Sequence, residues 1–130
     1  MPHITVEYTD NIKKEANITE LLRDINQAII AQGGVFPIGG IRARAIELTD
    51  YVVADGTEDD AFVHAALKIG AGRTIEEKRA VGDAIFSAMT EHLSELFYTR
   101  YLALSLEIIE FSEAGTYKKN NIHQRYKNKN

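Results

Sequence analysis

The sequence predicts an α/β (α+β) fold in which two β-α-β units form a four-stranded mixed sheet with two helices on one face. Strand-like segments alternate apolar and polar residues, while two longer segments repeat apolar residues at helical spacing. The order strand, helix, strand occurs twice, at about residues 3–48 and 61–111, which is a weak internal repeat. Because β-α-β crossovers are right-handed, we expect both helices to cover the same face.

The 130-residue chain suits one domain, residues 1–130, with a polar tail over 112–130. Its net charge of -4 disfavours binding to nucleic acid or to an anionic membrane. There is no cysteine, the apolar stretches are short, and the N-terminus does not resemble a signal peptide. We therefore expect a cytoplasmic protein without nucleic-acid or membrane partners.

The first predicted unit begins with a strand over His3–Tyr8, where His, Thr and Glu alternate with Ile, Val and Tyr. Asn17, followed three residues later by Glu20, predicts a capping box at the start of a helix. Glycines at 33 and 34 supply the left-handed conformation that would end it. A second strand is predicted over Ile41–Leu48, and Tyr51–Ala54 is either a short extension or an edge strand.

The second unit begins with a strand over Ala61–Ile69. Thr74 and Glu77 form a second capping box, which predicts a helix from Ile75 to about Thr99, and the last strand covers Leu102–Phe111. The sheet face opposite the helices has no cover within the chain, although its positions include Ala, Leu, Ile and Phe. We therefore expect this open face to be buried by self-association.

Pro2 is the first candidate for chemistry, because it directly follows Met1 and opens the first strand. If Met1 is removed, Pro2 becomes a free secondary amine, which is a base. If Met1 stays, the proline nitrogen is an amide without a useful lone pair, and Pro2 is only a rigid strand opener. Both alternatives follow from the sequence.

Three arginines are candidate anion-binding groups. Arg73 follows two glycines between a strand end and a helix start, where a carboxylate can meet both a guanidinium and backbone N–H groups; the alternative is a tight turn with a solvated arginine. Arg42 and Arg44 share one strand face, where they either face a site or form structural ion pairs. A basic nitrogen and three arginines suit a small substrate with several carboxylates and proton transfer next to a carbonyl.

The sequence predicts neither a metal site nor a serine or threonine nucleophile. The four histidines are scattered without paired ligand spacing, so no metal site is predicted, and no serine or threonine lies in a nucleophile elbow.

Seven segments, in order along the chain, resemble the 5-carboxymethyl-2-hydroxymuconate isomerase family of the tautomerase superfamily. The segments are Pro2-His3, Phe36-Pro37 with Gly40-Ile41-Arg42-Ala43-Arg44, Ala54-Asp55-Gly56, Ala61-Phe62-Val63-His64, Leu67-Lys68-Ile69-Gly70-Ala71-Gly72-Arg73, Leu102-Ala103-Leu104-Ser105, and Lys119-Asn120-Asn121-Ile122-His123. The resemblance implies a homotrimer without a cofactor. It also implies an isomerase that converts a 2-hydroxymuconate-type dienol to its conjugated 2-oxo isomer during homoprotocatechuate breakdown.

The resemblance assigns residues to roles. It implies that Pro2 moves the proton and that Arg42 and Arg73 lie near the substrate carboxylates, with Arg44 as a further candidate. The region of Asn120 and Asn121 corresponds to the family's tail, which we take as a subunit contact, with a place in the lining of the site as the alternative. Two alternatives stay open: a non-catalytic trimeric module that binds a dicarboxylate, and a tautomerase of the phenylpyruvate or oxalocrotonate type.

Overall fold

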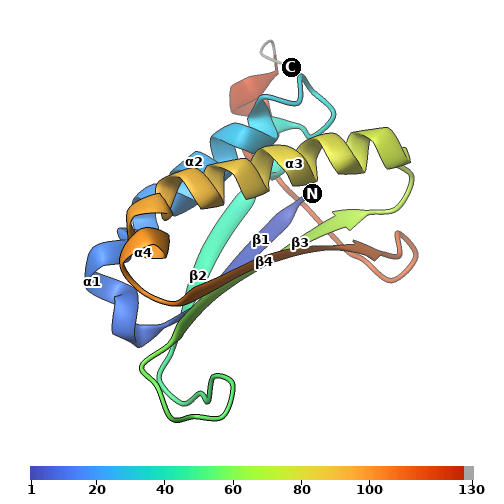
Figure 1. Ribbon diagram of the computed structural model, residues 1–130. Helices are drawn as coiled ribbons and strands as arrows, with labels where there is room; N and C mark the ends of the chain where they lie inside the picture. The colour runs from blue at the N-terminus through green and yellow to red at the C-terminus, as the bar shows by residue number, and fades with distance from the viewer. Residues whose placement is uncertain (128–130) are drawn as a thin grey trace.

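The computed structural model describes residues 1–127 and contains one four-stranded sheet with its two long helices on one face (Figure 1). The strands are β1 (His3–Thr9), β2 (Arg42–Leu48), β3 (Ala61–Gly70) and β4 (Leu102–Phe111). The long helices are α2 (Ile18–Ile30) and α3 (Ile75–His92). The short elements are η1 (Asp10–Ile12), α1 (Lys13–Ala16), η2 (Ile38–Gly40), α4 (Ser94–Thr99) and η3 (Ile122–Tyr126).

The sheet is mixed, as predicted, with strand order β2-β1-β3-β4. β1 is parallel to β2, β3 is parallel to β4, and the two central strands β1 and β3 are antiparallel. His3 therefore pairs with Arg42 on one side and with Lys68 on the other. This register brings the starts of β1 and β2 and the end of β3 to the same edge of the sheet.

The core lies between the sheet and the two long helices. It is built by the alternate strand residues that the period-2 pattern predicts, such as Ile4, Val6 and Leu67, all 0% exposed. The helices contribute residues at helical spacing, and the buried ones are Leu21, Ile25 and Ile29 from α2 with Val81, Ile85 and Met89 from α3. Burial of these apolar side chains stabilises the packing of the two β-α-β units against each other.

The two predicted capping boxes have different outcomes. The box at α3 is confirmed, because the Glu77 N–H donates to Thr74 Oγ1 at 3.1 Å and the Thr74 N–H donates to Glu77 Oε1 at 2.9 Å. The box at α2 is wrong: Asn17 is left-handed with φ 47°, and its side chain makes no cap hydrogen bond. Asn17 instead turns the chain between α1 and α2, since helix α1 already precedes it.

The ends of the predicted helices also need correction. α2 ends at Ile30, before the left-handed Gly33 and Gly34, with Ala31 as its cap. The single helix expected over 75–99 is divided at Leu93, whose φ of -98° and ψ of 13° separate α3 from α4. The bend keeps Leu93 on the core side at 1% exposure, and Leu96 after it is also buried.

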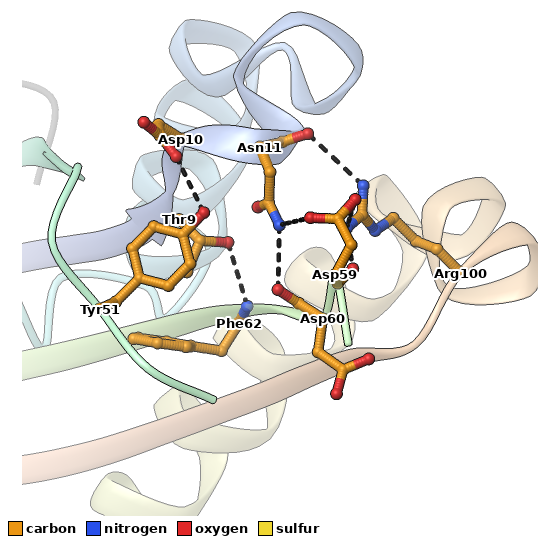
Figure 2. A network of polar contacts seen from close by, with 8 residues as sticks. All are labelled: Thr9, Asp10, Asn11, Tyr51, Asp59, Asp60, Phe62 and Arg100. Carbon is orange, nitrogen blue, oxygen red and sulfur yellow. Dashed lines mark hydrogen bonds and ion pairs between the residues drawn. The ribbon is translucent and has the colours of Figure 1, made fainter. Parts of the chain in front are cut away.

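Residues 51–54 are an irregular segment, so the predicted strand there is wrong. They belong to a loop that side chains hold against the far end of β1, as Figure 2 shows. The Tyr51 hydroxyl donates to Asp10 Oδ1 at 2.9 Å, and Asn11 Nδ2 donates to Asp59 Oδ1 at 3.0 Å. Arg100 also contacts Asp59 with a separation of 3.4 Å. These contacts replace the backbone pairing of a strand.

The open face of the sheet carries polar and apolar side chains side by side. His64 lies at its centre, with Nδ1 at 2.7 Å from Ser105 Oγ and Nε2 at 3.2 Å from Glu107 Oε1. Ile46, on the edge strand β2, is 46% exposed. No helix among residues 1–127 covers this face, and none has the length and hydropathy needed to cross a membrane.

Candidate functional site

The start of β1 is enclosed by the chain around it. Pro2 is buried, and its carbonyl accepts a hydrogen bond from the Arg42 N–H at 3.2 Å. This bond joins the residue before β1 to the first residue of β2. Met1 lies beside Gly40, where an added Cβ would lie 3.5 Å from Met1 Cα. Because Met1 is present, the Pro2 nitrogen is an amide here and the free amine belongs to Met1.

Arg73 is held in a fixed position near this end of the sheet. Its Nη1 donates to the Gly70 carbonyl at 3.2 Å and its Nη2 to the Val35 carbonyl at 3.3 Å. Its guanidinium carbon also lies 4.4 Å from the ring centroid of Phe36, a cation-π contact with a buried ring. Arg73 is therefore partly buried and oriented, and is not a freely solvated charge.

Arg42 and Arg44 lie in different surroundings, although both belong to β2. Arg42 is the first residue of the strand, and its Nη1 donates to the Gly40 carbonyl at 3.2 Å. Arg44 lies two residues further along, is exposed, and has its Nη1 at 3.2 Å from His3 Nδ1. The structure thus brings Pro2, Arg42 and Arg73 to one edge of the sheet and places Arg44 on the open face beyond them.

The amino-terminal amine has an altered pKa. Burial lowers its pKa below the ordinary value of an α-amino group, because the protonated form loses solvation. Three positive side chains lower this pKa further, and in order of effect they are Lys118, Arg73 and Arg42. The Glu113 carboxylate opposes them and raises it. The net result favours a neutral amine, which is the form that can accept a proton.

Two of these charges, Lys118 and Glu113, were missed by the sequence analysis. Both belong to the segment after β4, which the sequence marks only as a polar tail. The segment is anchored at Gly39, because Asn120 Nδ2 donates to the Gly39 carbonyl at 2.8 Å and the backbone of His123 packs directly on Gly39. These contacts join residues 81 or more positions apart, so local sequence patterns give no signal for them.

A cavity of about 490 Å³ lies next to the site. It lies between α2, η2 and η3, and Arg23, Asn26, Ile38, Gly39, Arg42 and Ile122 are among the residues that line it. Its volume falls in the range that holds small organic ligands. Within residues 1–127, no group of three or more His, Asp or Glu side chains is placed to hold a metal ion.

Comparison with known proteins identifies the family of the chain. Residues 2–126 match the family model described as 5-carboxymethyl-2-hydroxymuconate isomerase. The 5-carboxymethyl-2-hydroxymuconate Delta-isomerase of Escherichia coli is 41% identical over 127 residues, covering 98% of this chain and 100% of the relative.

Solved structures extend the comparison. A 5-carboxymethyl-2-hydroxymuconate isomerase from Deinococcus radiodurans R1 is 56% identical, with a TM-score of 0.92 over 96% of this chain and 93% of that one. A structure described as "Q0 fused 4-OT wild type symmetric trimer" is 26% identical, with a TM-score of 0.56 over 83% and 85% of the two chains. The resemblance seen in the sequence is confirmed: this chain belongs to the 5-carboxymethyl-2-hydroxymuconate isomerase family and is an isomerase with the tautomerase fold.

Proposed function

We propose that this protein converts a dienol of the 5-carboxymethyl-2-hydroxymuconate class to its conjugated 2-oxo isomer without a cofactor, as a step in the breakdown of an aromatic compound. The main support is the amine of Met1, whose pKa is lowered by burial and by nearby cations at the edge where Arg42 and Arg73 lie. The Pro2 amine that forms when Met1 is removed lies one residue further along the chain at the same edge, so we expect its pKa to be lowered by the same causes. A lowered pKa favours the neutral amine, which is the form that accepts a proton and can then return it.

In the proposed mechanism, Met1 is removed and the Pro2 amine becomes the general base. It accepts the proton of the dienol, and the electron pair is left delocalised along the conjugated chain as a dienolate. The protonated amine then donates the same proton to a carbon of that chain, which gives the 2-oxo isomer. The amine takes up one proton and returns it, and no electrons are gained or lost, so the reaction needs no electron acceptor.

The arginines have separate proposed roles. Arg73, oriented by Gly70, Val35 and the Phe36 ring, binds a substrate carboxylate and stabilises the dienolate. Arg42 binds a second carboxylate from the start of β2. Arg44, exposed on the open face, attracts the anionic substrate toward the site at long range.

The test compares processed protein, whose mass shows loss of Met1, with protein made while methionine aminopeptidase is inhibited. The second form has an amide at Pro2, so we expect its kcat/KM on 5-carboxymethyl-2-hydroxymuconate to fall about 10²- to 10⁴-fold, the usual contribution of general acid–base catalysis. In a second comparison, the kcat/KM of Pro2→Ala is measured against that of the wild-type protein on the same substrate. Equal rates for the processed and Met1-retaining proteins would reject Pro2 as the base.

We also propose a homotrimer that buries the open face of the sheet. The exposed Ile46 and the similarity to a structure described as a symmetric trimer support it. Light scattering after gel filtration should give three times the chain mass of 14.5 kDa. A monomer or dimer at micromolar concentration would contradict the proposal.

A further inference from the structure

The segment after β4 crosses the edge of the sheet where the proposed base lies. It starts beside the end of β3, because Phe111 pairs with Gly70 and an added Cβ on Gly70 would lie 2.5 Å from Glu113 Oε1. It is anchored again at the start of β2, where Asn120 and His123 contact Gly39. Since β1 lies between β3 and β2, the segment has to pass the start of β1. Figure 1 shows this path, from the end of β4 past the N-terminus to the helical turn near the C-terminus.

His123 shows how closely the segment approaches the N-terminus. An added Cβ on Gly40 would lie 3.4 Å from His123 Cε1 and 3.5 Å from Met1 Cα, so both atoms border the same small volume. Gly39 and Gly40 are both buried. A side chain on Gly39 would meet the His123 backbone at 2.8 Å, so the absence of a Cβ there allows the segment to dock.

Lys118 lies between the two anchors. Its Nζ is 3.9 Å from Glu113 Oε2, a long ion pair in which the lysine and glutamate side chains are 45% and 61% exposed. An exposed pair of this kind contributes only about 0–1 kcal/mol, so Glu113 does not hold Lys118 firmly and a substrate carboxylate can replace it. Among the charged side chains, Lys118 has the largest effect on the pKa of the Met1 amine, ahead of Arg73 and Arg42.

The charge of the substrate class fits this arrangement. A 5-carboxymethyl-2-hydroxymuconate has three carboxylates, two at the ends of the muconate chain and one on the carboxymethyl arm. Arg42 and Arg73 account for two of them in the proposed function. Lys118 is a further cation at the same edge, and it comes from a different segment of the chain than the two arginines.

We infer that the segment after β4 brings Lys118 to one side of the active site, and that Lys118 is a third substrate-binding cation that selects tricarboxylate over dicarboxylate dienols. This inference rests on the proposed isomerase function. The charged and titratable groups around the amine are Lys118 and Glu113 from this segment, Arg73 from the loop after β3, Arg42 from β2, and His3 from β1. His123 borders the N-terminus as well.

The experiment compares Lys118→Met with Lys119→Met, a change of the same size and charge at the neighbouring exposed lysine. Steady-state kinetics are measured on 5-carboxymethyl-2-hydroxymuconate and on 2-hydroxymuconate, which lacks the third carboxylate. We expect Lys118→Met to lower kcat/KM tenfold or more on the tricarboxylate, mainly through KM, and less than threefold on the dicarboxylate. Lys119→Met should match the wild type on both, and Lys118→Arg should restore most of the selectivity.

A second measurement does not depend on turnover. In processed protein labelled with ¹⁵N-proline, an NMR titration gives the pKa of the Pro2 amine, which we expect to rise in Lys118→Met and to stay unchanged in Lys119→Met. If no variant isomerises either substrate but this difference appears, the proposed function fails while the position of Lys118 beside the amine stands. Equal loss on both substrates, or identical behaviour of Lys118→Met and Lys119→Met, overturns the inference.

Discussion

Gly39→Ala should release the C-terminal segment from the body of the protein. Gly39 is buried, and an added Cβ would lie 2.8 Å from both Cα and N of His123. Carbon atoms pack best at about 3.5–4.0 Å, so the His123 backbone would have to move by roughly 0.7 Å or more. Backbone atoms cannot yield as the end of a flexible side chain can, and we therefore expect the segment to detach.

The size of the effect follows from the steric clash and from the hydrogen bond that would break. Forcing an extra methyl group into a packed site costs about 1–3 kcal/mol. The hydrogen bond from Asn120 to the Gly39 carbonyl, 2.8 Å long, contributes about 1 kcal/mol more. We expect the segment to open without unfolding of the sheet. The substitution should therefore lower the free energy of local opening of the segment, and the global unfolding free energy should change little.

Amide hydrogen exchange measured by mass spectrometry is the assay. Peptides covering residues 118–126 should exchange about tenfold faster or more in Gly39→Ala, while peptides from β1 and β3 keep their protection. Gly40→Ala is the matched control, because its Cβ would meet His123 Cε1 at 3.4 Å and Met1 Cα at 3.5 Å, which are ordinary contact distances. Unchanged exchange of the segment in Gly39→Ala would refute the docking of His123 on Gly39.

Three other changes test the site and the fold. Burial and nearby cations lower the pKa of the Met1 amine, and Glu113 raises it. We expect the same effects on the Pro2 amine once Met1 is removed, so kcat/KM of processed wild-type protein should rise with pH through an apparent pKa below that of an exposed N-terminal proline. Glu113→Gln should lower this pKa further, and an upward shift would contradict the assignment. Thr74→Ala removes the side chain that caps α3 and should lower the unfolding free energy in urea by about 1 kcal/mol, whereas Thr99→Ala, at the end of α4, should cost less. Thr9→Val should cost about 1–3 kcal/mol in the same assay, because the hydroxyl of buried Thr9 accepts the Phe62 N–H at 3.2 Å; a stability equal to wild type would show that this N–H finds another acceptor.

Much of the fold is predictable because it depends on local periodicity. The alternation in His3–Tyr8 and Ala61–Ile69 identifies the buried faces of β1 and β3, and the Thr74 capping box marks the start of α3. The same approach was wrong at Asn17, where a short preceding helix occupies the position that a cap would need. It was also wrong at Leu93, because the helical pattern continues although the chain bends to keep Leu93 in the core.

The candidate site also combines residues that the sequence predicts with residues that it does not. Pro2, Arg42 and Arg73 are recognisable from the sequence, since each lies beside a strand end or a glycine-rich turn, and the mixed sheet then places all three at one edge. The sequence by itself therefore determined the four strands, the positions of the two long helices, their order and the family. Only the tertiary structure decided that the segment after β4 returns past the N-terminus and brings Lys118 near the Met1 amine. The path of this segment depends on long-range contacts such as the hydrogen bond from Asn120 to Gly39, which no pattern within a few residues encodes.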